Sequence, residues 1–254
     1  MRINGSVIGS VVTSSQSSAV GMWDLRNVEL ANRQIIWPSA GSIITSGLIL
    51  NLDAGNVASY PGSGTTWTDL SGNGNNGTLI NGPTFNSSNG GSIVFDGTDD
   101  YVSASNSMLV HRTSNWTYSF WLKFSGTPSL GTIFENGSWI SCLLMRFQTD
   151  GISIYSMGSL WGKFTLSPTL GLWYKLDFIR NGSSLDFYLN SIYSQTMSFT
   201  ADIQPSSNIF IGSSQHTTGQ YFYGNISQVS IYNKSLSATE ILQNFNVTRT
   251  RFGV

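Results

Sequence analysis

The chain has 254 residues and a net charge of −1, and only 10% of its residues are charged, against roughly 25% in an ordinary soluble domain. The 13 acidic and 12 basic residues nearly cancel, which excludes the basic surface of a nucleic-acid-binding protein. The single cysteine, Cys142, excludes an intramolecular disulfide and a cysteine zinc site. With 40% hydrophobic and 13% aromatic residues, the chain can still build a core.

Residues 1–46 differ in composition from the rest of the chain. Residues 5–21 are rich in Ser, Thr and Gly, which is a flexible composition, and Asp24 can cap a short helix within residues 22–38. This segment is too short to bury its own apolar side chains, so they must dock either on the rest of the chain or on another subunit. We interpret residues 1–46 as an arm that anchors the protein in an assembly. The predicted anchor residues are Trp23, Leu25, Val28, Ile35, Ile36 and Trp37.

The N-terminus lacks the long apolar run and the cleavage site of a secretion signal. The longest apolar runs, such as residues 48–50 and 142–145, are too short to span a bilayer. We therefore expect synthesis in a reducing cytosol and no insertion into a membrane.

From residue 47 onward the sequence predicts short strands joined by turns. The clearest strand is residues 116–124, in which large apolar side chains alternate with Thr117, Ser119, Trp121 and Lys123. Regular short strands with Gly and Asn turns predict an all-β antiparallel sandwich. Further strands are predicted at residues 48–53, 92–95, 131–135, 140–147, 152–155, 163–166, 173–180, 185–190, 192–197, 208–212 and 221–232.

Two local signals refine this prediction near the C-terminus. In the strand 221–232 the apolar phase slips between Ile226 and Val229, which a β-bulge would explain. After it, Ser237 and Glu240 form the pattern of a capping box, and Ile241, Leu242 and Phe245 give one short helix an apolar face.

Four sequence stretches together resemble a known family. They are Leu-Asp-Ala-Gly at 52–55, Trp-Thr-Asp-Leu-Ser-Gly-Asn-Gly-Asn-Asn-Gly-Thr-Leu at 67–79, Phe-Asp-Gly-Thr-Asp-Asp-Tyr-Val at 95–102, and residues 224–237 with the helix that follows. These stretches resemble laminin-G-like, concanavalin A-like jelly-roll modules, in the family's order. The resemblance covers residues 47–254 and implies two curved antiparallel sheets stacked face to face, behind the arm of residues 1–46.

This form of the module resembles proteins of tailed bacteriophages. Residues 21–38 are similar to the leaders of phage structural proteins, and residues 238–246 with 251–253 fit the same group. The resemblance implies a virion component, either a tail or fibre protein or a capsid decoration protein. Its expected partners are other virion proteins and further copies of itself in a homo-oligomer, and its expected location is the virion, after synthesis in the host cytoplasm.

Catalysis is the first chemistry to test, because the same fold hosts glucanases. Glycoside hydrolysis needs two carboxyl groups about 5–5.5 Å or roughly 6.5–9.5 Å apart. The sequence has no Glu-x-Asp-x-Glu pattern, and its only glutamates are Glu29, Glu135 and Glu240. We therefore expect no enzyme.

Asp177 and Asp186 are the best carboxylate pair that the sequence offers, on the hairpin around residues 181–184. A two-residue turn would place them directly opposite each other, which is unfavourable for like charges. A four-residue loop places Asp177 opposite Tyr188 instead, and we expect this longer loop. We interpret the two aspartates as part of a solvated polar face.

Calcium is the one candidate cofactor. Its ligands would be Asp69 and Asn73, in a Gly-rich turn, and Asp99, because Ca²⁺ takes hard oxygen ligands and the resemblance implies that such modules sometimes bind calcium at their rim. The alternative is that Asn and Gly supply the left-handed conformations of turns.

Sugar binding would use exposed aromatic faces beside Asn, Asp or Gln side chains. The candidates lie in or next to Gly and Ser turns, and the alternative for each is ordinary loop packing. They are Trp139, Trp161, Tyr221 and Tyr223. The sequence thus predicts a non-enzymatic virion structural protein whose lectin-like domain packs in the particle and contacts host surface glycans. The alternatives are a free-standing carbohydrate-binding module and, third, a glycan-degrading enzyme.

Overall fold

The computed structural model describes residues 41–105, 114–126, 131–136, 142–148, 150–156, 159–203, 208–214 and 219–254. The chain divides into two units, Met1–Ile43 and Ile44–Val254, and the fold described below is that of the second. Several predicted site residues lie outside the described residues, so their predictions stay untested. These are Trp139 and the anchor residues Trp23, Leu25, Val28, Ile35, Ile36 and Trp37.

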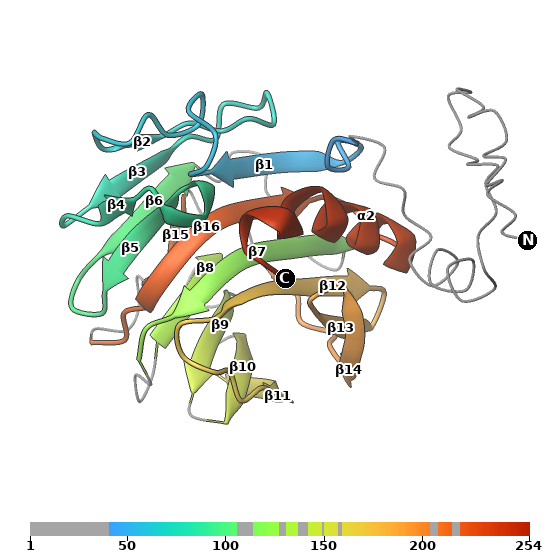
Figure 1. Ribbon diagram of the computed structural model, residues 1–254. Helices are drawn as coiled ribbons and strands as arrows, with labels where there is room; N and C mark the ends of the chain where they lie inside the picture. Colours follow the sequence, from blue (N-terminus) through green and yellow to red (C-terminus); the bar gives the residue numbers. More distant parts are fainter. Residues whose placement is uncertain are drawn as a thin grey trace, which may run out of the picture. The chain divides into compact units, whose positions relative to one another are not determined.

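The second unit is a sandwich of two antiparallel sheets (Figure 1), which confirms the predicted fold class. Sheet A has the order β14-β13-β12-β7-β16-β5-β4, and β1 also pairs with β16. Its strands are β1 (Leu48–Asp53), β4 (Thr84–Asn86), β5 (Ser92–Asp96), β7 (Trp116–Phe124), β12 (Trp173–Asn181), β13 (Ser184–Leu189), β14 (Ile192–Ser198) and β16 (Tyr223–Tyr232).

Sheet B has the order β11-β10-β9-β8-β15-β6-β3-β2. Its strands are β2 (Thr66–Trp67), β3 (Gly77–Ile80), β6 (Tyr101–Ser105), β8 (Gly131–Asn136), β9 (Leu143–Gln148), β10 (Gly151–Ser156), β11 (Ser159–Thr165) and β15 (Asn208–Ile211). Three helical elements complete the described part of the chain: η1 (Ser88–Gly90), α2 (Ala238–Thr248) and η2 (Arg249–Arg251).

Strand β7 shows how the alternation of side chains along the sequence predicted a strand. It has the predicted bounds, and one set of alternate side chains, from Trp116 through Phe120 to Phe124, lies in the main core between the sheets. The neighbouring strand β16 shifts its register against β7 between Ile226 and Gln228, so the predicted bulge is confirmed. The strands β2, β3, β4 and β6 were not predicted, because they have only 2, 4, 3 and 5 residues and so give little alternation to detect.

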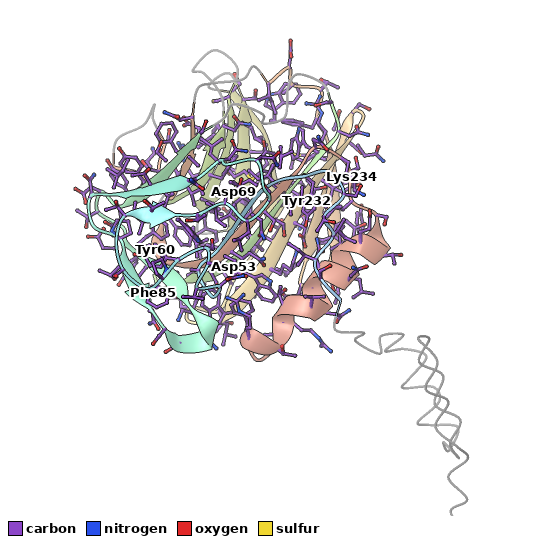
Figure 2. The ribbon with its side chains drawn as sticks, turned by 90° about the horizontal axis from the view of Figure 1, so that it is seen from above. Asp53, Tyr60, Asp69, Phe85, Tyr232 and Lys234 are labelled. Carbon is purple, nitrogen blue, oxygen red and sulfur yellow. The ribbon has the colours of Figure 1, made fainter. Side chains whose placement is uncertain are left out.

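Helix α2 lies over the outer face of sheet A (Figure 1). The predicted capping box is present, since Ser237 Oγ accepts from the Glu240 amide while Glu240 accepts from the Ser237 amide. Ile241 and Phe245 are buried, whereas Leu242, which we assigned to the apolar face, is 37% exposed. The helix is also tied to β16, because Asn244 Nδ2 donates to the Oη of Tyr232 at 3.0 Å; Tyr232 is labelled in Figure 2.

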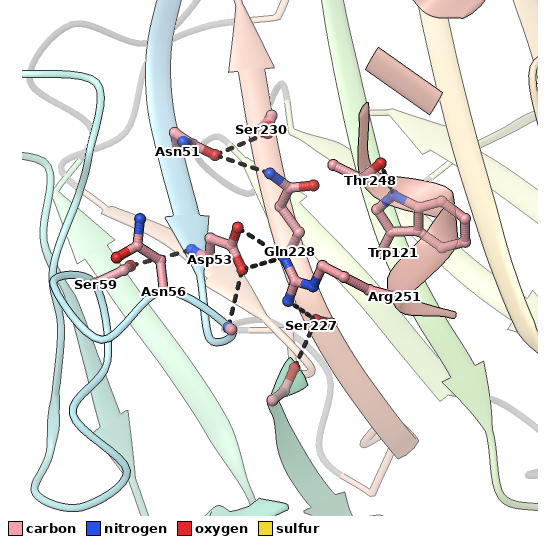
Figure 3. A network of polar contacts seen from close by, with 12 residues as sticks. Asn51, Asp53, Asn56, Ser59, Trp121, Ser227, Gln228, Ser230, Thr248 and Arg251 are labelled. Carbon is pink, nitrogen blue, oxygen red and sulfur yellow. Dashed lines mark hydrogen bonds and ion pairs between the residues drawn. The ribbon is translucent and has the colours of Figure 1, made fainter. Parts of the chain in front are cut away.

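The helix buries the second set of side chains on β7. The Trp121 ring stacks on Phe252 with centroids 4.1 Å apart and on Phe245 at 5.7 Å. Its indole Nε1 donates to Thr248 Oγ1 at 2.8 Å (Figure 3). Sheet A is therefore buried on both faces along β7, which the alternation in the sequence did not indicate.

The same cover overturns one expectation about β12. Asp177 pairs with Tyr188, so the longer hairpin loop is confirmed. The solvated polar face is wrong, because Asp177 and Lys175 are both buried. They form an ion pair, and Lys175 Nζ also donates to Ser119 Oγ at 2.7 Å. Asp186 lies on β13 opposite Ile179, so the two aspartates are not paired across the hairpin.

Within the described residues, no helix has both the length and the apolar character needed to cross a bilayer.

Candidate functional site

The loop that contains Asp69 is organised by that carboxylate (labelled in Figure 2). Asp69 is buried, and its Oδ1 accepts from the amides of Asn51 at 2.8 Å and Ser71 at 2.9 Å. Its Oδ2 accepts from Ser71 Oγ at 2.7 Å and from the Asn75 amide at 3.0 Å. Asn73 Nδ2 donates to Ser71 Oγ at 3.0 Å. A calcium ion at Asp69 and Asn73 stays a prediction, and it would compete with these bonds.

The first motif of the resemblance holds the C-terminal segment in place. Arg251 Nη1 donates to both carboxylate oxygens of Asp53 at 2.9 Å, and its Nη2 donates to Ser227 Oγ at 3.0 Å (Figure 3). A Cβ atom on Gly55 would lie 1.8 Å from Arg251 Nη2. The Asp-Ala-Gly stretch therefore needs glycine at this position so that the guanidinium can reach Asp53.

The third motif brings three carboxylates together at the turn between β5 and β6. Ligand oxygens of Asp96, Asp99 and Asp100 all lie within 4.8 Å of one another, with Asp96 and Asp99 exposed and Asp100 buried. Burial raises the pKa of Asp100, and the charges of Asp96 and Asp99 raise it further, against a lowering hydrogen bond from the Asp96 amide. Carboxylate oxygens are the ligands that Ca²⁺ prefers. The predicted ligand Asp99 thus has two acidic neighbours, and Asp69 is not one of them.

Tyr223 lies beside this acidic turn. It is the first residue of β16, pairs with Asp96 on β5, and is 42% exposed. A Cβ atom would lie 2.6 Å from the Tyr223 ring if placed on Gly126 and 2.9 Å from Tyr223 Cβ if placed on Gly97. The two glycines therefore let the tyrosine side chain lie close against the backbone, with part of the ring open to solvent.

The other aromatic candidates have different surroundings. Trp161, on the edge strand β11 of sheet B, is 37% exposed and its ring packs edge-on against Phe199 with centroids 5.4 Å apart. Tyr221 is half-buried and directly precedes Phe222, which lies in the core. The structure thus places one predicted aromatic, Tyr223, opposite Asp96, whose carboxylate belongs to the same cluster as the predicted metal ligand Asp99.

A buried polar cluster on sheet B was not predicted. Glu135 is fully buried and accepts a hydrogen bond from Ser214 Oγ. Arg146 is buried on the neighbouring strand with its guanidinium 5.0 Å from the Tyr155 ring centroid. Burial lowers the pKa of Arg146, and Tyr155 and Glu135 oppose that shift. The sequence did carry a signal for this cluster: Arg146 is the one charged residue in the otherwise apolar run 143–147. Leu143, Met145 and Phe147 face the core, so Arg146 lies on the opposite face.

Glu135 is the sole acidic residue in the eight strands of sheet B as the structure describes them. Glycoside hydrolysis needs a pair of carboxyl groups, and the described strands of sheet B supply one. Glu135 is moreover buried and hydrogen-bonded.

These sheets and rims define a jelly-roll β-sandwich of the lectin-like class. The family described as the concanavalin A-like lectin/glucanases superfamily (laminin G type) matches residues 96–242, and the chain belongs to it. No curated protein sequence matches the chain. The family's description includes both lectins and glucanases, so membership alone leaves binding and hydrolysis open.

Solved structures with the same fold include toxin binding domains. The botulinum neurotoxin serotype D binding domain is 15% identical, with a TM-score of 0.64 over 80% of this chain and 51% of that one. The binding domain of Paraclostridial Mosquitocidal Protein 1 is 15% identical, with a TM-score of 0.64 over 79% and 52%. The serotype D ligand-binding domain in complex with N-acetylneuraminic acid is 14% identical, with a TM-score of 0.65 over 80% and 51%. The chain spans about half the length of these domains.

Proposed function

We propose that this chain is a non-enzymatic, lectin-like structural component of a virion, whose jelly roll binds a glycan on the host surface. The observation that carries glycan binding is the exposed Tyr223 ring beside Asp96 and Asp99. An aromatic face packs against the apolar face of a sugar ring, while nearby polar groups bond its hydroxyls. The exposure of Tyr223 and its pairing with Asp96 support this arrangement.

The carboxylates support binding rather than hydrolysis. The described strands of sheet B contain one acidic residue, Glu135, and Asp177 is buried in an ion pair with Lys175. The similar solved structures are described as binding domains, which agrees with this choice. Glycan cleavage by the purified chain that is lost in Glu135→Gln would contradict the non-enzymatic part.

The virion role rests on the sequence resemblance of residues 21–38, and of residues 238–246 with 251–253, to phage structural proteins. In this proposal residues 1–46 attach the protein to neighbouring virion subunits, and the jelly rolls pack into a homo-oligomer. Residue Ile44 already belongs to the second unit, and its amide donates to Asn244 Oδ1 at 2.8 Å. A deletion that tests anchoring should therefore end at residue 43.

A glycan array tests the binding site. We expect the full chain to bind a subset of glycans and Tyr223→Ala to lose at least ten-fold in signal. The matched control is Tyr193→Ala, because Tyr193 is a tyrosine of similar exposure (51%) on β14, and it should bind as the wild type does. Equal binding by all three proteins would rule out the Tyr223 site, and no binding by the wild type would rule out the lectin role.

The same array tests calcium. If Asp96, Asp99 and Asp100 hold a calcium ion that shapes the Tyr223 rim, chelation with EDTA weakens binding and added calcium restores it. Asp99→Asn should then bind like the chelated wild type. Binding that is insensitive both to EDTA and to Asp99→Asn would contradict a calcium ion at Asp96, Asp99 and Asp100 that shapes the rim, and it would leave the Tyr223 contact standing.

Incorporation into particles tests the structural role. We expect the full chain to purify with virions and a chain without residues 1–43 to be absent from them. Retention of the shortened chain in particles would contradict the anchoring role of the arm. Absence of the full chain from particles, with glycan binding intact, would favour a free-standing carbohydrate-binding module.

A further inference from the structure

A pocket of about 360 Å³ lies beside the outer face of sheet A. It is lined by η1, the end of β7, the start of β12, the turn between β13 and β14, and residues 252–254. Figure 1 shows this end of the chain next to β7 and β12. The volume falls in the lower part of the range of small-molecule pockets, about 300–1,000 Å³, so it suits one small ligand rather than a polymer segment.

The rear wall of the pocket is held rigidly. Trp173 Nε1 donates to Asn89 Oδ1 at 3.2 Å, and the Trp173 and Phe252 rings lie 4.8 Å apart. Phe252 in turn stacks on Trp121. A wall fixed in this way pays little conformational entropy when a ligand arrives, which favours binding.

The pocket has one charged side chain, the cation Lys123, and a free amide donor on Asn190. Lys123 Nζ lies 5.2 Å from the centroid of the Trp173 ring and forms no hydrogen bond or ion pair with any described residue. Asn190 Oδ1 already accepts from the Lys175 amide at 2.8 Å, so the side chain has its Nδ2 hydrogens left to offer. Neither aspartate nor glutamate is among the lining residues. The side chains that line the pocket therefore include one cation and no anion, and a ligand can supply the negative charge that they do not.

The same face carries Tyr223. Lys123 pairs with Asn225, which lies two residues from Tyr223 on β16, and the core side chains of Leu122, Phe124, Phe222 and Ile226 occupy the opposite face. Diagonal neighbours of this kind are about 7–8 Å apart. That separation suits two adjacent units of one glycan, the first on Tyr223 and the second at Lys123.

We propose that the pocket binds a carboxylate-bearing sugar, with its carboxylate on Lys123 Nζ, a further acceptor on Asn190 Nδ2 and its apolar side toward Leu172. The proposal rests on the proposed glycan binding, and it names the acidic sugar unit that lies next to the one on Tyr223. An ammonium–carboxylate hydrogen bond is charge-assisted and roughly twice as strong as a neutral one. A neutral sugar would leave the ammonium partly desolvated without a counter-charge, so the pocket discriminates against it.

Ligand-detected NMR titration of the full chain tests the proposal. The probes are N-acetylneuraminic acid and glucuronic acid as sugar acids, N-acetylglucosamine as a neutral sugar, and inorganic phosphate as an anion without a sugar ring. We expect the two sugar acids to bind at least ten-fold more tightly than either comparison probe. Lys123→Met should lose at least ten-fold in affinity, and Lys123→Arg should retain affinity within about three-fold because it keeps the charge.

Two further variants serve as checks: one changes a second residue of the pocket, and the other removes a lysine outside it. Asn190→Asp should also lose the sugar acids, because it adds a negative charge to the pocket. Lys163→Met removes an exposed lysine that pairs with Asp150 on sheet B, and it should bind like the wild type. Binding of phosphate or the neutral sugar equal to that of the sugar acids would overturn the proposal. So would unchanged affinity in both Lys123→Met and Asn190→Asp.

The outcome separates this inference from the proposed function. Array binding that depends on Tyr223, without any binding of free sugar acids, overturns the inference alone. Sugar-acid binding that depends on Lys123, without any dependence of the array on Tyr223, supports the pocket and overturns the Tyr223 site.

Discussion

Lys175 and Asp177 lie two residues apart on β12 and are buried on the face that α2 covers. Removing two charges from water costs several kcal/mol per ion, and their mutual attraction offsets this only with good geometry and further hydrogen bonds. Lys175 has such a bond to Ser119, whereas Asp177 Oδ2 has no partner among the described residues. Losing one member of the pair should therefore destabilise the fold more than replacing both members with apolar residues.

This dependence predicts an asymmetric response to mutation. Lys175→Met leaves Asp177 as an uncompensated buried charge, and we expect the free energy of unfolding to fall by about 3–5 kcal/mol. The double variant Lys175→Met/Asp177→Leu should recover most of that loss. Guanidinium unfolding followed by tryptophan fluorescence measures both.

The matched control for this experiment is Lys163→Met, which breaks an exposed lysine–aspartate pair on β11. Exposed pairs contribute about 0–1 kcal/mol. If Lys175→Met costs no more than Lys163→Met, the buried pair is not the constraint that the structure indicates.

At the scale of elements, the start of α2 is fixed by hydrogen bonds between residues close together in the sequence. Ser237 and Glu240 satisfy each other's amides, and Lys234 Nζ donates to Glu240 Oε1 at 2.6 Å. The hydrogen bond from Lys234 holds the pKa of Glu240 below its usual value. Burial opposes this shift, and the bonds from Ser237 lower the pKa further. Since the folded state favours the ionised carboxylate, Glu240 stabilises the fold above the pKa of an unfolded glutamate, and the contribution disappears as the pH falls.

Two variants of the cap follow from this. Ser237→Ala should lower the free energy of unfolding by about 1 kcal/mol. Glu240→Gln should be less stable than the wild type at pH 7, and the difference should narrow as the pH falls below about 4. Thr239→Ala, at an exposed position of the same turn, should change stability by less than about 0.5 kcal/mol. A constant difference between Glu240→Gln and the wild type from pH 7 to pH 3 would contradict the ionic role of Glu240.

At the scale of the whole molecule, the described residues of the main core all belong to the second unit. Ile44 packs against the smaller cluster of Ile179, Tyr232, Leu236 and Ile241 beneath α2. The predicted boundary at residue 46 would cut this contact. We therefore expect the jelly roll to need residues from 44 onward for full stability.

Two shortened chains test this boundary. Residues 44–254 should unfold with the same denaturant midpoint as the full chain, because they keep every core contact of the second unit. Residues 47–254 should unfold at a lower midpoint, because they lose Ile44 and its bond to Asn244. Equal midpoints for the two shortened chains would show that Ile44 adds nothing, and a lower midpoint for both would show that the first unit stabilises the second.

The sequence by itself determined the features that depend on neighbouring residues. Alternation along β7 predicted the strand with its bounds, the phase slip at Ile226 predicted the bulge, and the Ser237–Glu240 spacing predicted the cap, because each is a local period or a local hydrogen bond. Like-charge repulsion between Asp177 and Asp186 was enough to choose the longer hairpin loop.

Only the tertiary structure decided which polar residues are buried and which distant ones meet. Lys175 and Asp177 follow the pattern of a solvated face, yet α2 covers that face, and no local period encodes the cover. Tyr223 meets Asp96 because β16 pairs with β5, and the Lys123 pocket forms because the chain's last residues return to β7 and β12. Burial and pairing across long sequence separations depend on the whole fold. The sequence therefore identified individual residues of the candidate site, and only the structure showed which of them lie together.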